Sequence, residues 1–366
     1  MATADDARTD RDERLDELAL RAVHEQRVPA VLVAVVDDDG TRFGCAGTLD
    51  LVHGGRTALD AAANWFSMTK VVTATTAMAL AERGELDLDA PVAELLGDVW
   101  PTAFGEARVR HLLDHSSGLS NPIPIRWVHA PDRPRPDPRE FLAHLLHRQR
   151  RPRSTPGTRA RYSNVGYLAL GECISAAGGA PFEDVVDRTV LHPLAMTSTS
   201  WSWSTLEGTA RLSAHHPMSR PVAALMHRVL PPGILAERAG GFVRLRAFDV
   251  DGAAYGGLVG TIGDAAQVLA LHARGAAAGG DIVLGPASRR AMATIGTPGR
   301  PYDLGLGWFR PHGEQSQRVQ HLGGGMGYWH VMRLDPEAGA GACVFGTSGR
   351  RWPIAELADA AIDGPR

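Results

Sequence analysis

The chain has 366 residues, of which 44% are hydrophobic, and a formal net charge of -3. This length and apolar content suit one large domain, or two closely joined ones, with a substantial core. The small net charge excludes the global basic field by which many proteins bind nucleic acid or an anionic membrane, so we expect neither partner. The three cysteines lie far apart and form no CxxC pair, which argues against a disulfide framework and a zinc site.

The N-terminal residues 1–14 are polar and charged, and we expect them to form a disordered tail. They lack the basic start and the apolar run of a secretory signal. No uncharged apolar stretch approaches the roughly 18 to 20 residues that are needed to span a bilayer. We therefore expect a protein of the reducing cytoplasm. An amphipathic helix is predicted from Leu15 to about Arg27.

Two β-hairpins are predicted near opposite ends of the chain. The first has its turn at residues 37–40, and the second joins residues 328–334 to 342–348 before a closing helix over 353–362. Each hairpin is too small to be stable alone, so the two need a common sheet. We therefore predict an α+β fold, with an antiparallel sheet formed from both chain termini and flanked by helices, and an inserted, mostly helical lobe.

The middle of the chain is predicted to be mainly helical. A single domain is expected over residues 15–366, with 15–70 and 255–366 forming an α/β lobe and 71–254 the inserted helical lobe. Residues 121–138 and 215–251 are rich in Pro, Arg or Gly, and we predict that both are long loops. Helices are predicted over residues 67–83, 138–149, 165–178, 181–189 and 263–274, the last capped at Thr261.

The stretch Asn64–Lys70, NWFSMTK, contains the only lysine of a chain in which Lys and Arg total 38. Ser67 and Lys70 are three residues apart, so on a helix their side chains can meet. A serine hydroxyl is a weak nucleophile until a base takes its proton, and a lysine of lowered pKa can be that base, whereas arginine cannot. The first helical turn would also favour negative charge on the Ser67 oxygen. The alternative is a solvated Lys70 with a serine at this spacing by chance, about once in twenty.

A second element, RYSNVGY, places Tyr162 and Asn164 in a turn before an apolar helix. A tyrosine hydroxyl beside a lysine ammonium loses its proton more easily and can act as a general base or proton shuttle. An asparagine amide can orient the lysine and hold a substrate carbonyl. A turn-capping asparagine and a core tyrosine would explain the same pattern.

A third element, HLGGGMGY at residues 321–328, leads into the first strand of the C-terminal hairpin. Glycines at a strand edge allow an acyl group to lie close to the backbone. An N–H group there can join that of Ser67 in an oxyanion hole. By itself, such a run is more typical of a bulge or a turn.

In this order, the three elements resemble the serine β-lactamase and penicillin-binding protein superfamily, whose nucleophile motif is SxxK. The resemblance is closest to the class C β-lactamase-like group, which includes esterases, D-amino-acid peptidases and transacylases. Stretches such as VRHLLDHSSGL and AAYGGLVGTIGDAAQVLAL resemble the usual sequence motifs of that group, so the resemblance covers roughly residues 20–350. It implies a sheet built from both termini, with the site between the sheet and the helical lobe.

The resemblance also implies roles for individual residues. Ser67 would be the acylated nucleophile, and Lys70 and Tyr162 would be the proton-transfer pair. The residues that orient the substrate would be Asn164, His321 and Gly323, and the backbone N–H groups of Ser67 and Gly324 would form the oxyanion hole.

The third motif departs from that of the β-lactamases, in which a Lys-Thr-Gly sequence receives the carboxylate of the antibiotic. Here the motif is His321-Leu322-Gly323. Leu322 offers no hydrogen bond, and His321 is mostly neutral near pH 7 in the absence of a perturbing neighbour. A substrate carboxylate therefore loses its main receptor, and we do not expect β-lactamase or D-peptidase activity.

We expect a serine acyl-enzyme hydrolase that acts on a small ester or amide. The alternatives are a transacylase, which would pass the acyl group to a second substrate carrying an amine or alcohol, and a non-catalytic binding protein of the same fold. We expect no cofactor and no metal, because the His215–His216 pair lacks a matching carboxylate. Arginine-bearing loops at 126–139 and 227–246 could receive an anionic substrate but are more typical of solvated loops.

Overall fold

The computed structural model describes residues 11–206, 208–275 and 283–364. The predicted tail therefore lies mostly outside the described residues. Its predicted end at residue 14 is too late, because helix α2 begins at Glu13 and extends to Gln26. The side chain of Asp12 accepts hydrogen bonds from the backbone N–H groups of Arg14 and Leu15, which fixes the start of the helix.

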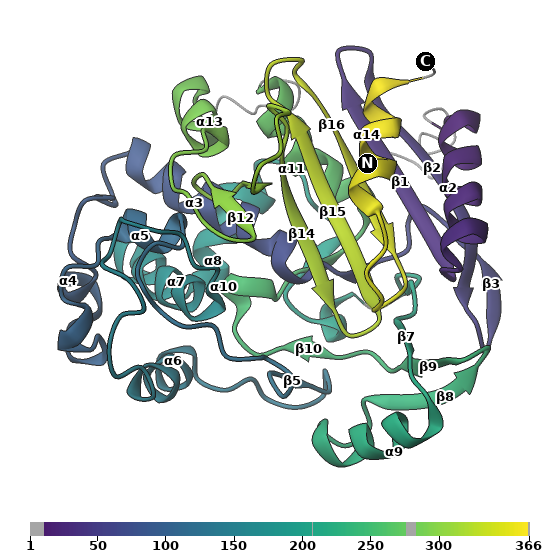
Figure 1. Ribbon diagram of the computed structural model, residues 1–366, viewed down its shortest axis with the longest axis horizontal. Coiled ribbons are helices and arrows are strands. Elements are labelled where there is room, and N and C mark those ends of the chain that lie inside the picture. The colour runs from purple at the N-terminus through teal and green to yellow at the C-terminus, as the bar shows by residue number, and fades with distance from the viewer. Residues whose placement is uncertain (1–10, 207, 276–282, 365–366) are drawn as a thin grey trace.

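An antiparallel eight-stranded sheet forms the centre of the molecule, in the order β12-β13-β14-β15-β16-β1-β2-β3 (Figure 1). Strand β1 pairs antiparallel with β16, so that Val31 lies opposite Gly346. This pairing confirms that segments from both ends of the chain share one sheet. The strands are β1 (Ala30–Asp37), β2 (Gly40–Asp50), β3 (Gly54–Arg56), β12 (Tyr302–Leu304), β13 (Phe309–Pro311), β14 (Val319–Gly325), β15 (Tyr328–Asp335) and β16 (Ala340–Gly346).

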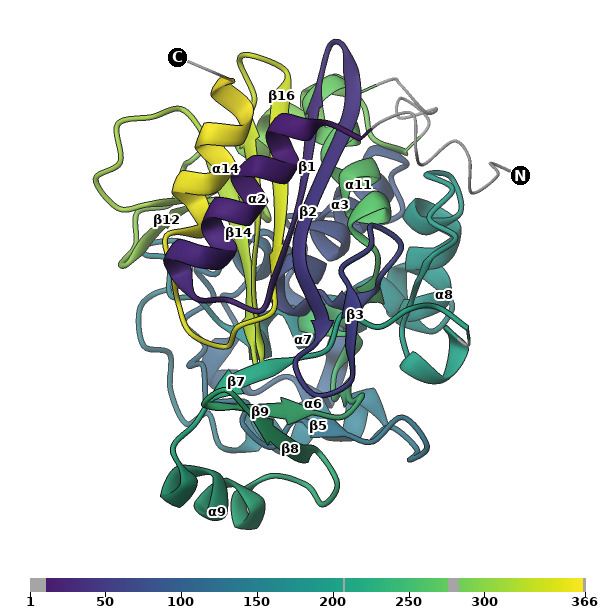
Figure 2. The ribbon, with the colours of Figure 1, turned by 90° about the vertical axis from the view of Figure 1, so that its right-hand side faces the viewer.

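Helices cover both faces of this sheet. Helices α2 and α14 (Ile354–Asp363) lie side by side on one face, as Figure 2 shows, and pack on Val31, Val33 and Val35. The alternate side chains of β1 face the other core, which includes α11 (Ile262–Arg274). Burial on both faces explains why β1 reads as a continuous apolar run and not as an alternating pattern.

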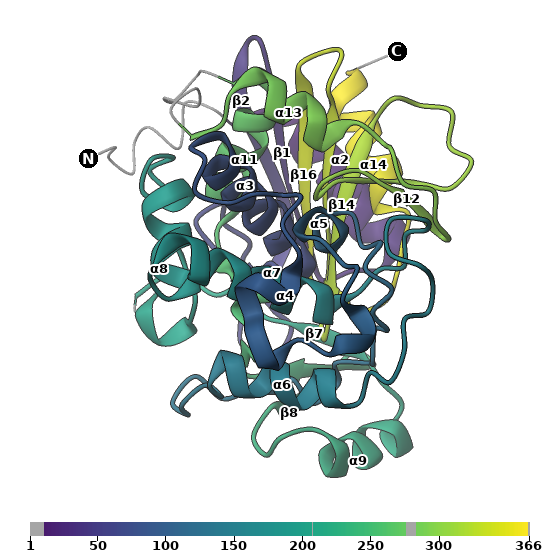
Figure 3. The same ribbon diagram turned by 90° about the vertical axis from the view of Figure 1, so that its left-hand side faces the viewer.

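The inserted lobe is mostly helical, as predicted, and Figure 3 looks onto it. At its centre, α3 packs against α7, and residues 69–80 of α3 are all buried, which suits a helix that is apolar on every side. The predicted helices all form, with bounds that differ by a few residues. They are α3 (Thr69–Glu82), α6 (Pro138–His147), α7 (Asn164–Gly178), α8 (Phe182–Val186), which a π-helical turn (Asp187–Leu191) follows, and α11. Two short helices of the lobe were not predicted, namely α4 (Val92–Leu96) and α5 (Val109–Leu113).

The prediction of a long loop over residues 215–251 is wrong. A three-stranded sheet in the order β7-β9-β8 and a helix, α9, occupy most of this segment. Its strands have only three to five residues, too few for an alternating pattern to be visible among the arginines, prolines and glycines. The elements are β7 (His215–Pro217), α9 (Arg220–Val229), β8 (Leu235–Ala239), β9 (Phe242–Leu245) and β10 (Asp249–Val250).

Short elements complete the fold, and residues 121–138 are irregular apart from β5 and the start of α6. Thr261 caps α11 as predicted, since its hydroxyl accepts a hydrogen bond from the N–H of Asp264.

Within the described residues, no helix has both the length and the apolar character to cross a bilayer. The division into two lobes at residues 70 and 255 stays a prediction. The remaining elements are β4 (Ala63–Asn64), the 3-10 helix η1 (Phe66–Met68), η2 (Gly97–Val99), η3 (Thr102–Phe104), β5 (Val128–His129), β6 (Thr199–Ser200), η5 (Trp203–Thr205), α10 (Ala253–Gly256), β11 (Val259–Gly260) and α13 (Pro286–Ala293).

Candidate active site

Ser67 lies in the 3-10 turn η1, immediately before α3, where it is half-buried. The preceding residue, Phe66, has a φ of 48°, a left-handed conformation that costs a non-glycine residue about 1 to 2 kcal/mol. Its ring packs between those of Phe248 and Tyr328, with centroids 6.0 and 6.1 Å away. A Cβ atom on Gly325 would lie 2.2 Å from the same ring, so the glycine is required there. These contacts hold the backbone turn that presents Ser67.

Lys70 is completely buried one helical turn beyond Ser67. Its Nζ lies 3.0 Å from Ser67 Oγ, 2.9 Å from Asn164 Oδ1 and 2.8 Å from the backbone oxygen of Tyr255. Burial lowers the pKa of Lys70 well below its ordinary value, since desolvation disfavours the charged form. The faces of three tyrosine rings, with centroids 4.9 to 5.4 Å away, favour the cation and offset part of that effect.

The three oxygens around Lys70 fit either protonation state, since an ammonium donates one hydrogen bond to each of them, Ser67 Oγ included. Burial favours the neutral amine, which has two N–H donors and one lone pair. In that form the oxygens of Asn164 and Tyr255, which can only accept, take the two donors, and the lone pair is left for the hydroxyl of Ser67. The arrangement can therefore remove a proton from Ser67.

Tyr162 lies beside both residues, since its ring centroid is 4.9 Å from Lys70 Nζ and its side chain forms a hydrogen bond with that of Ser67. Burial raises the pKa of the Tyr162 phenol, and the bond to Ser67 opposes this only in part. The phenol therefore does not lose its proton more easily than usual, contrary to the sequence-based expectation, because burial disfavours the phenolate. In its neutral form Tyr162 can still relay a proton.

Asn164 is the first residue of α7, and the cap of this helix is the adjacent Ser163, whose hydroxyl accepts a hydrogen bond from the N–H of Gly166. Asn164 is thus not needed as a capping residue, and its side chain is directed to Lys70. The backbone N–H of Asn164 donates a hydrogen bond to the side-chain Oδ1 of Asn121, at 3.0 Å. The turn before α7 brings both Tyr162 and Asn164 to the serine, as the motif predicts.

Residues 321–325 of the glycine-rich motif lie within strand β14 and do not merely lead into a strand. His321 on this strand is only 1% exposed, and burial lowers its pKa to about 3, so the ring is neutral. The ring lies beside Tyr162, with centroids 6.1 Å apart, and does not line the cavity at Ser67. His321 does not border this cavity, and its role in orienting the substrate stays a prediction.

The two predicted glycines of β14 differ in their surroundings. A Cβ atom on Gly323 would lie 2.3 Å from the backbone oxygen of Trp65, so this glycine allows β14 to approach the turn that carries Ser67. Gly324 is exposed and lines the same cavity as Ser67. The predicted pair of N–H donors, on Ser67 and Gly324, therefore borders one cavity.

This cavity has a volume of about 290 Å³, and its walls are mainly apolar. Residues 123–125 of the predicted loop form one wall, where Ile123 is 82% exposed and Ile125 39%. Among the described residues that line the cavity there is no Asp, Glu, Lys or Arg. The lining residues are Phe66, Ser67, Ile123, Pro124, Ile125, Val128, Asn164, His216, Val250, Tyr255, Gly324, Gly325 and Met326.

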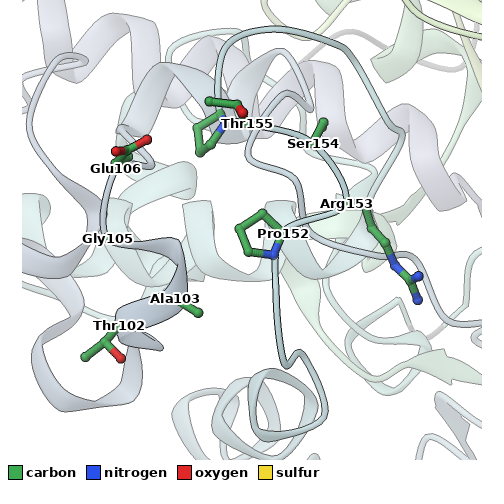
Figure 4. Close-up of a pocket in the computed structure, with 9 residues that line it drawn as sticks. Thr102, Ala103, Gly105, Glu106, Pro152, Arg153, Ser154 and Thr155 are labelled. Atoms are coloured by element: carbon green, nitrogen blue, oxygen red, sulfur yellow. The ribbon is translucent and has the colours of Figure 1, made fainter.

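A larger cavity of about 540 Å³ lies elsewhere, between residues 102–106 and 152–156 (Figure 4). It contains none of the predicted site residues. In Figure 4 the side chain of Arg153 extends away from Thr102 and Glu106. In the part of the chain that the structure describes, no three His, Cys, Asp or Glu residues lie together as metal ligands would.

Sequence reasoning missed two residues that touch the predicted ones. The backbone oxygen of Tyr255 binds Lys70, and its ring lines the cavity. The ring of His115 stacks on that of Tyr162, with centroids 4.5 Å apart, and its Nδ1 accepts the N–H of Ser163. Both occur in stretches that carry the family resemblance, AAYGG and HSSG, which was the available signal.

The sequence model of the family described as Beta-lactamase matches residues 15–363, and the chain belongs to this family of serine acyl-enzyme hydrolases. Esterase EstB of Burkholderia gladioli is 30% identical over 81% of this chain and 78% of its own length. The D-alanyl-D-alanine-carboxypeptidase/endopeptidase AmpH of Escherichia coli is 23% identical over 85% of this chain and 77% of its own.

Solved structures share the fold. The structure of EstCE1, a hydrolase with promiscuous acyltransferase activity, superposes with a TM-score of 0.73 at 20% identity, covering 99% of this chain and 100% of the other. A D-amino acid amidase from Ochrobactrum anthropi gives a TM-score of 0.71 at 21% identity, covering 92% of this chain and 91% of the other. These likenesses bear out the predicted β-lactamase-like α+β fold.

Proposed function

We propose that this chain hydrolyses small esters or amides with an uncharged, apolar acyl group, through an acyl-enzyme on Ser67. The proposal rests on one distance: Ser67 Oγ, which borders an apolar cavity, lies 3.0 Å from the Nζ of the fully buried Lys70. A buried lysine of lowered pKa is the base that a serine nucleophile needs.

The proposed reaction begins when Lys70 takes the proton of Ser67 and the oxygen attacks the substrate carbonyl. The N–H groups of Ser67 and Gly324 would stabilise the oxyanion. The leaving group then departs with a proton relayed through Lys70 and Tyr162. A water molecule, deprotonated by the same pair, would release the acid and restore the serine.

The acyl preference is inferred from the cavity. Its apolar walls and the absence of charged residues among its described lining favour aliphatic or aromatic acyl groups. His321, buried and neutral, offers no cation for the carboxylate of a β-lactam or a D-peptide. EstB is named as an esterase and the Ochrobactrum protein as an amidase, and these names support the cleavage of ester and amide bonds.

Acyl transfer to an alcohol or amine is the second candidate. The wall of the cavity at Ile123 and Ile125 is exposed, so a second apolar molecule could reach the acyl-enzyme there. The structurally similar EstCE1, which is described as a hydrolase with promiscuous acyltransferase activity, supports this candidate. Product analysis of p-nitrophenyl butyrate turnover, with and without added 1-butanol or benzylamine, separates the two outcomes.

The test of the nucleophile is intact mass after incubation with a fluorophosphonate, followed by turnover of p-nitrophenyl butyrate. We expect one adduct, located on Ser67 by peptide mapping, and measurable hydrolysis. Ser67→Ala should lose both while keeping the same melting temperature. Well-folded protein without an adduct would instead support a non-catalytic binding role.

A further inference from the structure

A third cavity, of about 440 Å³, lies against Tyr162. Four arginines, Arg153, Arg159, Arg161 and Arg300, line it. Among the described residues that line this cavity there is no Asp or Glu. Its other lining residues are Leu119, Ser120, Asn121, Ala160, Tyr162 and Pro301.

The charges of these arginines are not neutralised within the described part of the protein. None of the four side chains takes part in an ion pair or a side-chain hydrogen bond with a described residue. Two arginines from the loops that the sequence had suggested as possible anion receptors are ion-paired instead. Arg135 pairs with Glu183 at 3.1 Å, and Arg244 pairs with Asp50 at 2.7 Å.

The sequence around the cavity also has an excess of positive over negative residues. Residues 141–171 include six arginines, at positions 148, 150, 151, 153, 159 and 161, and no Asp or Glu. The chain as a whole carries a formal charge of -3. A local excess of positive charge in a slightly acidic protein attracts an anion to this site in particular.

The arginine cavity and the apolar cavity share no lining residue, but hydrogen-bonded residues connect their walls. Tyr162 lines the first and hydrogen-bonds to Ser67, which lines the second. Asn121 lines the arginine cavity, and its side-chain oxygen accepts a hydrogen bond from the backbone N–H of Asn164. Asn164 in turn lines the apolar cavity. A substrate whose carbonyl lies at Ser67 can therefore place its acyl group in one cavity and its leaving group in the other.

We propose that the natural leaving group carries phosphate, which the four arginines receive, as in an acyl thioester of a phosphorylated thiol. This proposal rests on the proposed acyl-enzyme function of Ser67. Guanidinium groups bind phosphate oxygens with paired hydrogen bonds, and several of them suit a di- or triphosphorylated group better than a single carboxylate.

The acylation of Ser67 by the thioester needs no reactant besides the substrate, and the release of the acyl group needs only water. The bond between Ser67 Oγ and the carbonyl carbon forms, and the carbon–sulfur bond breaks. The proton taken from Ser67 goes to the departing thiolate, which leaves as the phosphorylated thiol. Water then hydrolyses the acyl-enzyme and yields the free acid.

The experiment compares three substrates with one acyl group: butyryl-coenzyme A, butyryl-dephospho-coenzyme A and butyryl-N-acetylcysteamine, which carry three, two and no phosphates. We expect kcat/KM to fall in that order. In the variant Arg153→Gln/Arg159→Gln/Arg300→Gln, kcat/KM for the coenzyme A thioester should fall about tenfold to 100-fold, with little change for the neutral thioester. Added salt should lower the rate only for the phosphorylated substrates.

The control is Arg21→Gln, which removes one exposed charge on α2, across the sheet from the helical lobe (Figure 1). It should leave all three values unchanged. Equal kcat/KM for the three thioesters, or an equal loss for all three in the triple variant, would overturn the phosphate site. Failure of the acyl-enzyme function is a separate result, namely no turnover of p-nitrophenyl butyrate by the unmodified protein.

Discussion

The Nζ atom of Lys70 lies 2.8 Å from the backbone oxygen of Tyr255, although 185 positions separate the two residues in the chain. With the side-chain oxygen of Asn164 at 2.9 Å, this contact accounts for both donors of a neutral amine. The lone pair then faces Ser67. Burial lowers the pKa of the lysine, and acceptors from two distant segments orient its neutral amine toward the serine.

The pKa of Lys70 can be measured directly, because the chain contains no other lysine. Protein labelled with ¹³C-lysine should give a single Cε resonance, whose shift follows the protonation of Nζ. We expect its midpoint well below 10.5, since burial is the cause that lowers this pKa. A midpoint at or above 10.5 would show that Lys70 is a cation at working pH and not a base.

Lys70→Arg keeps the positive charge and removes the titratable amine. We expect kcat for p-nitrophenyl butyrate to fall about 100-fold to 10,000-fold, because arginine cannot accept the serine proton. Circular dichroism and the melting temperature report whether the buried guanidinium is tolerated. Near-normal turnover in folded protein would exclude Lys70 as the base.

Asn164→Asp places a carboxylate where the amide oxygen now lies 2.9 Å from Lys70 Nζ. An adjacent negative charge stabilises the ammonium, so the pKa of Lys70 should rise. The pH at which kcat/KM reaches half its maximum should rise with it, as should the midpoint of the ¹³C-lysine titration. The control is Asn121→Asp, which adds the same charge at a residue that hydrogen-bonds to Asn164 but not directly to Lys70. Equal shifts in the two variants would argue against a direct effect.

Gly323→Ala tests the close approach of β14 to the nucleophile turn. The added Cβ would lie 2.3 Å from the backbone oxygen of Trp65, so the strand must move away from Ser67. We expect a loss of about 1 to 3 kcal/mol in the free energy of unfolding and a disproportionate loss of kcat, because Gly324 moves with the strand. The matched control is Gly296→Ala, where an added Cβ meets no atom within 4 Å. If the two variants retain similar activity, the spacing between β14 and Ser67 does not matter for catalysis.

Buried histidines should make the protein less stable in acid. Burial lowers the pKa of His272 and His330 to about 3 and that of His215 to about 4, from an ordinary 6.5. Between these values the unfolded state binds protons that the folded state does not, so stability falls as pH falls from 6.5 toward 4. Urea denaturation at pH 7.5, 6.0 and 5.0 measures this slope.

The contribution of one buried group is tested with His272→Gln, which should flatten the dependence of the unfolding free energy on pH. His272 contacts the Thr75 hydroxyl, at 2.9 Å, so the variant loses some stability at every pH. The control is His147→Gln, at an exposed position of α6, which should keep the full slope. An unchanged slope in His272→Gln would mean that this histidine does not titrate differently on unfolding.

Much of the fold was predictable because it depends on local patterns. Strand β1 is a continuous apolar segment apart from its last residue, and the turn at residues 37–40 specifies a hairpin. Residues 215–251 were misread because short strands have too few positions to show a period. Among the site residues, Ser67 and Lys70 were found from their spacing on one helix. His321 was assigned a substrate-orienting role from its motif alone, and its burial could not be anticipated.

The sequence by itself determined which residues are the candidates for the chemistry, since side-chain type and spacing limit what can act as nucleophile and base. One lysine among so many arginines already indicated a position where a removable proton is required. Only the tertiary structure decided how those groups behave. Burial lowers the pKa of Lys70, and the oxygens of Asn164 and Tyr255 orient its amine. The side chain of Arg153 is left without an ion pair among the described residues because the fold brings no described acid to it. Solvation and charge pairing are properties of surroundings in space, and segments far apart in the chain create them.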